Sequence, residues 1–145
     1  MGYIAAPFAG NVPLFDLLAA DERGFSIPIQ VKAINGPSWQ YRADTFVKIK
    51  HVHKSQYFLG KTLLPNPDLI CIYVFLHKDA QPDEFFIFRL RELQDLTVKN
   101  YFPNGRSRVR PKNSTSTHCA VCPKEIESFR DNWGLIRKSF EERRA

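Results

Sequence analysis

The sequence lacks several features that define common classes of protein. It has three cysteines among 145 residues, an odd and small number that provides no disulfide framework and indicates a reducing compartment, so we expect a cytoplasmic protein. The longest apolar run spans eight residues, 69–76, and a membrane-spanning helix needs about 20, so no membrane partner is expected. The first residues, MGYIAAPFAGN, have neither a basic stretch nor a long apolar stretch, and we expect no signal peptide. No phosphate-binding glycine loop, dinucleotide fingerprint or nucleophilic serine motif is present.

The composition is that of a folded protein with an uneven charge. Hydrophobic residues make up 43% and charged residues 25%, which predicts a single domain over residues 1–145 that folds without disulfides or a structural metal. Residues 101–145 carry ten Lys and Arg against five Asp and Glu, whereas residues 1–100 carry 11 against ten. Such a basic segment favours a polyanion as partner, nucleic acid first, and the alternative is a solvated basic surface.

Hydrophobic periodicity predicts an α/β or α+β domain with one mixed sheet. A hairpin is expected from residues 14–20 and 25–34, because both are apolar or alternating and a polar turn with a glycine separates them. Residues 69–76 are nearly all apolar, which is typical of a central strand buried on both faces. Further strands are predicted over 39–41, 45–52 and 85–90, a short helix over 91–101, a mobile loop over 103–117, and a final helix over 123–143.

Three polar residues in the predicted hairpin could carry chemistry. Asp16 interrupts an apolar strand, and Gln30 and Lys32 share one face of the next strand because they are two residues apart. A carboxylate, a neutral oxygen donor and an ammonium in one cleft suit a hard cation such as Mg²⁺ beside a phosphate. The alternative is a buried Asp16–Lys32 ion pair with a hydrogen-bonded Gln30, in a protein that serves only for interaction.

The segment PLFDLLAADERGFSIPIQVKAI resembles the core of the PD-(D/E)XK, or restriction-endonuclease-like, nuclease superfamily. In that pattern an aspartate on one strand is followed by E-x-K or Q-x-K on the next, and Asp16 with Gln30-Val31-Lys32 matches the Q-x-K variant. The later NPDLICIYVFL and DEFFIFRL are similar to the strands that follow in small bacterial members. The resemblance implies a restriction-endonuclease-like core over residues 1–102, with a central mixed β-sheet flanked by helices.

The resemblance also implies roles for these residues. Asp16, the Gln30 side chain and the Val31 backbone carbonyl would bind Mg²⁺ or Mn²⁺, and Lys32 would orient the attacking water and stabilise charge on the phosphate. The expected function is metal-dependent hydrolysis of phosphodiester bonds in DNA, and a homodimer is expected by analogy. The alternative is a catalytically inactive protein of this fold that binds nucleic acid or a protein partner.

Two further patterns bear on partners and metals. Candidate phosphate contacts on the expected strand 45–52 and in the loop 103–117 are Lys48, Lys50, Arg106, Arg108, Arg110 and Lys112. His118 and the pair Cys119 and Cys122 form one C-x-x-C motif, and a structural zinc site usually needs two such pairs. The sequence therefore does not favour zinc, and ordinary packing explains these cysteines better.

Overall fold

The computed structural model describes residues 2–8 and 14–145. Its contacts divide the chain into two compact units, which the backbone enters alternately. Unit 1 comprises residues 1–39, 68–89 and 122–145, and unit 2 comprises residues 40–67 and 90–121. Among the described residues, no helix is both long enough and apolar enough to cross a membrane.

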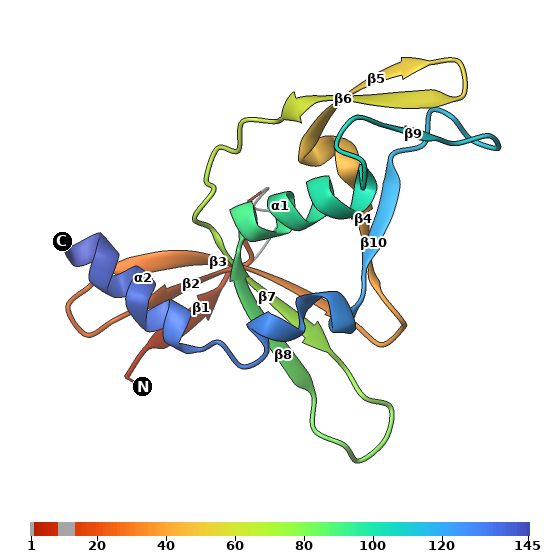
Figure 1. Ribbon diagram of the computed structural model, residues 1–145. Helices are drawn as coiled ribbons and strands as arrows, with labels where there is room; N and C mark the ends of the chain where they lie inside the picture. The colour runs from red at the N-terminus through yellow and green to blue at the C-terminus, as the bar shows by residue number, and fades with distance from the viewer. Residues whose placement is uncertain (1, 9–13) are drawn as a thin grey trace. The chain divides into compact units, whose positions relative to one another are not determined.

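Unit 1 is built on a five-stranded sheet, drawn as a ribbon in Figure 1, with the strand order β1-β2-β3-β7-β8. The strands are β1 (Ile4–Pro7), β2 (Leu17–Ala20), β3 (Ser26–Ile34), β7 (Ile70–Phe75) and β8 (Glu84–Arg89). The β3–β7 pair is parallel and the other pairs are antiparallel. The predicted hairpin, which is β2 with β3, and the mixed sheet are therefore confirmed.

Apolar side chains cover both faces of this sheet. On one face, Ile29 and Ile72 pack with Ile136 and Phe140 of helix α2 (Gly134–Arg144). On the other face, a chain of ring contacts runs between aromatic side chains with centroid distances of 4.9–5.4 Å. Its members are Trp39, Tyr73, Phe88 and Phe129. The first five residues of β7 are buried because the strand lies between these two layers, as its apolar composition predicts.

The C-terminal segment differs from the single predicted helix over 123–143. A 3₁₀ helix covers Pro123–Phe129, the backbone turns at Asp131 with φ of 50°, and only then does α2 begin. The reason is that the apolar residues of this segment serve both faces of the sheet: Phe129 contacts Phe88 on one face, and Phe140 packs on the other. A straight helix could not pass around the edge strand β8. At the point where the chain passes this strand, the Asp131 N–H donates a hydrogen bond to the Phe85 carbonyl at 2.9 Å.

Unit 2 contains helix α1 (Leu90–Tyr101), a three-stranded sheet of order β5-β6-β9 and the pair β10-β4. The strands are β4 (Trp39–Arg42), which enters this unit after Trp39, β5 (Val47–Val52), β6 (Ser55–Lys61), β9 (Ser107–Val109) and β10 (His118–Val121). Helix α1 is anchored by Gln94, whose amide donates to the carbonyls of Phe46 and Thr62 at 2.9 Å each. The predicted helix is confirmed, whereas β6 and β9 lie in segments whose apolar pattern is too weak to predict a strand.

The irregular pairing of β5 with β6 explains part of that weakness. The register shifts between Lys48 and Ile49, which pair with Gly60 and Phe58, so Leu59 is an extra residue of the kind that makes a β-bulge. Gly60 has φ of 123°, a conformation that residues with a Cβ atom rarely adopt. The bulge breaks the strict alternation by which a strand is recognised in a sequence.

We expect Phe140→Ala to lower the free energy of unfolding of the protein by about 3–5 kcal/mol, because the ring is fully buried and stacks on Tyr3 at 4.6 Å. Urea titration followed by circular dichroism measures this change. Arg137→Ala on the exposed face of the same helix is the control and should change the value by less than about 0.5 kcal/mol. Equal effects of the two substitutions would contradict the described packing of α2 on the sheet.

Candidate active site and basic surface

Asp16 lies immediately before β2 and is held in place by its backbone. Its N–H donates to the Ile29 carbonyl at 2.9 Å, and its own carbonyl accepts from the Phe8 N–H at 3.1 Å. Since Leu17 is the ladder partner of Ile29, two consecutive residues face one residue of β3, which is the pattern of a β-bulge. Such bulges redirect a side chain and are common next to active sites.

The redirected carboxylate of Asp16 meets the next strand directly. Its Oδ2 atom accepts a hydrogen bond from the Val31 N–H at 2.7 Å, where a backbone carbonyl would otherwise continue the ladder. The contact joins residues 15 positions apart and places the carboxylate beside the Gln30-Val31-Lys32 segment. Asp16 is nevertheless exposed to solvent.

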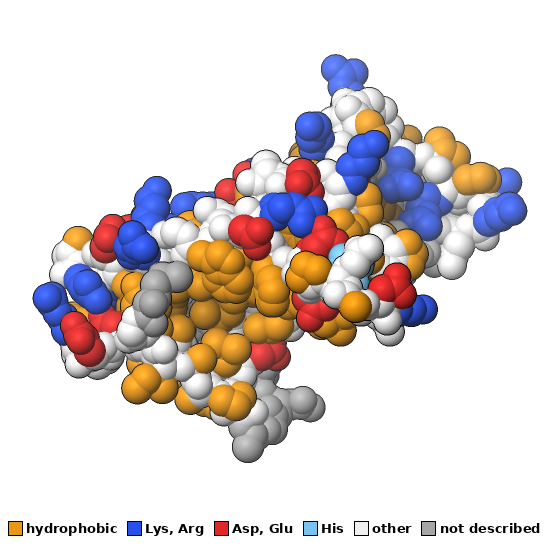
Figure 2. Space-filling model, turned by 90° about the horizontal axis from the view of Figure 1, so that it is seen from below, with side chains coloured by type: hydrophobic (Ala, Val, Ile, Leu, Met, Phe, Trp, Pro, Cys, Tyr) orange, Lys and Arg blue, Asp and Glu red, His pale blue; other side chains and the backbone are white. Residues whose placement is uncertain are grey.

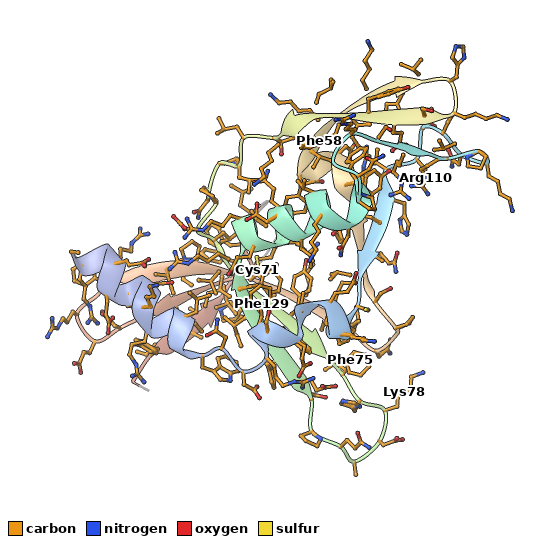
Figure 3. The ribbon with its side chains drawn as sticks, viewed as in Figure 1. Phe58, Cys71, Phe75, Lys78, Arg110 and Phe129 are labelled. Atoms are coloured by element: carbon orange, nitrogen blue, oxygen red, sulfur yellow. The ribbon has the colours of Figure 1, made fainter. Side chains whose placement is uncertain are left out.

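Gln30 and Lys32 lie on the face of β3 opposite to Ile29. Gln30 is half-buried, and its Oε1 atom is 3.9 Å from the Cys71 thiol of β7, which is labelled in Figure 3. Lys32 is exposed, and its carbonyl accepts a hydrogen bond from the Trp39 indole at 3.1 Å. The bond to Trp39 fixes the backbone at Lys32 and leaves its ammonium group in solvent.

The interpretation of Asp16 and Lys32 as a buried ion pair is wrong. Both side chains are exposed, and within the described ranges 2–8 and 14–145 neither forms an ion pair. A carboxylate and an ammonium that are free of each other remain available to a ligand. Leaving these two charged groups unpaired costs little free energy of desolvation, because water reaches both of them.

A hollow follows Lys32 along the chain. It has a volume of about 440 Å³ and is lined by Ala33, Ile34, Asn35, Gly36, Ser38 and Leu76. It lies at the carboxyl ends of the parallel strands β3 and β7, where ligands commonly bind in α/β sheets. Its volume is within the range of ligand pockets, and Asn35 and Ser38 provide polar groups that the sequence did not single out.

The six predicted phosphate contacts do not form one row in the structure. Arg108 and Arg110 are half-buried and bind groups of unit 2 itself. The Arg108 guanidinium lies 4.0 Å from the centre of the Tyr101 ring, and Arg110, labelled in Figure 3, donates to the carbonyls of Ser116 and His118 at 3.0 and 3.1 Å. Lys48, Lys50, Arg106 and Lys112 are exposed.

The segment 103–117 is consequently more ordered than the mobile loop that its composition predicts. It contains the short strand β9, which pairs with β6. The fully buried Gln56 donates to the carbonyls of Ser114 and Ser116 at 2.8 Å each and accepts from the Tyr101 hydroxyl at 2.6 Å. A buried side chain anchors this polar segment, and no periodicity within the segment reveals it.

The cysteines of the C-x-x-C motif are free thiols. In the described part of the chain, no three His, Cys, Asp or Glu side chains gather in the way that a zinc site built from such ligands requires. Burial raises the pKa of the Cys119 thiol to about 11, an effect that the Tyr41 hydroxyl partly opposes. Cys119 is therefore a neutral thiol near pH 7, and neutral thiols are poor nucleophiles.

Comparison with known proteins supports the fold. No family model and no curated protein matches the chain. The structure is similar to that of a bacterial homing endonuclease, I-Ssp6803I, with a TM-score of 0.50 and 12% sequence identity. The match covers 99% of this chain and 85% of that one. The chain thus has the mixed α/β fold of an endonuclease, a likeness that at this identity concerns the fold alone.

We expect Arg110→Ala to lower the free energy of unfolding by about 0.5–1.5 kcal/mol, because it removes the hydrogen bonds that the half-buried guanidinium donates to the carbonyls of Ser116 and His118. Lys112 lies two residues further along the chain and is exposed. Lys112→Ala removes the same charge and should change the free energy of unfolding by less than about 0.5 kcal/mol. Urea titration of both variants measures the difference. If Arg110→Ala were as harmless as Lys112→Ala, its guanidinium would be free to bind phosphate.

Proposed function

We propose that this protein is a metal-dependent nuclease that hydrolyses phosphodiester bonds of DNA, with its reaction centre at Asp16, Gln30, Val31 and Lys32. The observation that carries the proposal is the hydrogen bond from the Val31 N–H to the Asp16 carboxylate at 2.7 Å. It brings an exposed carboxylate to the strand segment that presents an amide oxygen and an exposed ammonium. The likeness of the fold to an endonuclease supports the same class of reaction.

The oxygen atoms at this position suit a hard divalent cation. The Asp16 carboxylate and the Gln30 side-chain carbonyl are oxygen donors of the kind that Mg²⁺ and Mn²⁺ prefer. The N–H and C=O of one residue in an extended strand point to the same side, so the Val31 carbonyl is directed toward Asp16 along with the N–H that Asp16 binds. When bound, such a cation polarises the phosphate and lowers the pKa of a coordinated water.

Lys32 contributes the positive charge of the protein itself. Its side chain projects from the same face of β3 as Gln30, since the two are separated by one residue. An ammonium at this place would orient the attacking water and stabilise the negative charge that develops on the phosphate oxygens. The hollow beyond Lys32 offers space for the nucleotide next to the cleaved bond.

A second candidate function is favoured by one feature of the same centre. Gln30 is neutral, so Asp16 alone would supply negative charge to a divalent cation. A protein with so little charge at this place would bind nucleic acid without cutting it. Cleavage assays separate the two functions.

We expect Mg²⁺ or Mn²⁺ to support nicking or cleavage of supercoiled DNA, and Asp16→Ala and Lys32→Ala each to reduce the rate by at least about 10²–10³-fold. The reason is that each substitution removes a group that acts on the reacting phosphate or its metal. Conversion of supercoiled to open circular and linear plasmid, followed on agarose gels, measures the rate. Lys78→Ala, an exposed lysine of the loop between β7 and β8, is the matched control and should keep full activity.

Gln30→Glu adds a carboxylate to the same centre. We expect it to lower the concentration of Mg²⁺ needed for half-maximal cleavage, because a second negative charge strengthens binding of the cation. Activity that survives Asp16→Ala would indicate a contaminating nuclease. Absence of cleavage in either metal, by both the unmodified protein and Gln30→Glu, would favour the non-catalytic function.

A further inference from the structure

The net positive charge of the protein belongs to unit 2. This unit holds 11 Lys and Arg against three Asp and Glu, a net charge of +8, whereas unit 1 holds ten against 12, a net charge of −2. Two of the three acidic residues in unit 2 are neutralised locally, since Asp44 pairs with Arg42 and Asp95 pairs with Lys61. In Figure 2, Lys and Arg side chains lie at the left, interspersed with Asp and Glu, and also at the right, the side on which Figure 1 draws β5, β6 and β9.

The three-stranded sheet of unit 2 has two chemically different faces. Cross-strand partners share a face, so Gln56, His51 and Arg108 lie together on the face that is joined to Tyr101. The opposite side, which we call the outer face, presents Lys48, Lys50, Tyr57 and Ser107. Arg106 precedes β9 at its margin.

The outer face is hollowed and combines cations with apolar groups. A hollow of about 530 Å³ is lined by Lys50, Val52, Tyr57, Phe58, Leu59, Gly105 and Arg106. Tyr57 is 43% exposed and Leu59 is 59% exposed. Within the described residues, Lys48, Lys50 and Arg106 form no ion pair.

Duplex DNA fits these properties best. Its phosphates would pair with the exposed cations, and bases or sugars offer apolar contacts to Tyr57 and Leu59. The outer two strands of a three-stranded sheet lie roughly 10 Å apart, and the major groove of B-DNA is about 12 Å wide. A lipid surface would instead favour apolar side chains that protrude, whereas here they line a hollow between cations.

We propose that unit 2 docks on duplex DNA through the outer face, with Lys48, Lys50 and Arg106 contacting phosphates and Tyr57 contacting the groove between them. This rests on the proposed function, because it names the surface by which the nuclease holds its substrate. Binding belongs to unit 2 and the reaction centre to unit 1, so each can fail without the other. Arg108 and Arg110 are not part of this surface, because unit 2 uses both guanidinium groups internally.

The test measures binding of a fluorescein-labelled 30-base-pair DNA duplex by anisotropy, from about 50 to 200 mM NaCl, with EDTA present and Asp16→Ala in every variant to prevent cleavage. Replacing Lys48, Lys50 and Arg106 by alanine should weaken binding at least about tenfold at 100 mM salt. It should also reduce the slope of log K against log salt by about 2–3, since each phosphate contact contributes about 0.9. The control replaces Lys78, Lys99 and Lys138, which are exposed elsewhere, and should leave the slope within about 1 of its original value.

Further variants keep the proposal open to refutation if the triple variant does not fold. Lys50→Glu alone should weaken DNA binding. Tyr57→Ala should weaken DNA binding without changing the salt slope, whereas the Tyr57→Phe protein should bind DNA as tightly as the unmodified protein does. Equal losses in the triple variant and its control would overturn the proposal. It would also be overturned if the triple substitution impaired binding only to duplex RNA or to phosphatidylserine vesicles. Absence of cleavage by the unmodified protein, together with intact DNA binding, would reject the proposed reaction and leave this surface standing.

Discussion

The hydrogen bond between the Val31 N–H and the Asp16 carboxylate is the constraint on which the candidate site depends. It forms where the β2–β3 ladder stops, one step beyond the pair of Leu17 with Ile29. Because a bulge at Asp16 replaces a regular ladder residue, a side chain takes the place that a backbone carbonyl would have occupied. One local irregularity thus brings the Asp16 carboxylate to the strand segment that carries Gln30 and Lys32.

The rest of unit 1 serves to hold that irregularity in register. β3 has β2 on one side and the parallel strand β7 on the other, and β7 lies between two apolar layers. Since a one-residue slip in a strand moves its side chains to the opposite face, the buried Ile29 and Ile72 fix which way Gln30 and Lys32 point. The packed core therefore determines the geometry of a site that is itself exposed.

Unit 2 follows a different logic, because much of its interior is polar. Gln56 and Tyr101 satisfy the carbonyls of a segment that has no apolar residues to bury, and Arg108 and Arg110 complete that network. A buried polar group without partners would cost free energy, so these residues tie the segment to β6 and α1. Two of the arginines that composition assigns to a partner, Arg108 and Arg110, are structural. The exposed basic surface that remains is smaller and lies on β5 and beside β9.

The sequence alone determined what depends on local pattern. Alternation predicted the β2–β3 hairpin, an unbroken apolar run predicted the two-sided burial of β7, and residue spacing predicted that Gln30 and Lys32 share a face. Contacts between residues far apart in the chain were decided only by the tertiary structure. These are the turn of Asp16 toward Val31, the break at Asp131 that lets the chain pass around β8, and the anchoring of residues 114–116 by Gln56. Periodicity describes which side of its own element a residue faces, but the partner of a polar group about 60 residues away is set by packing, and packing exists only in the folded chain.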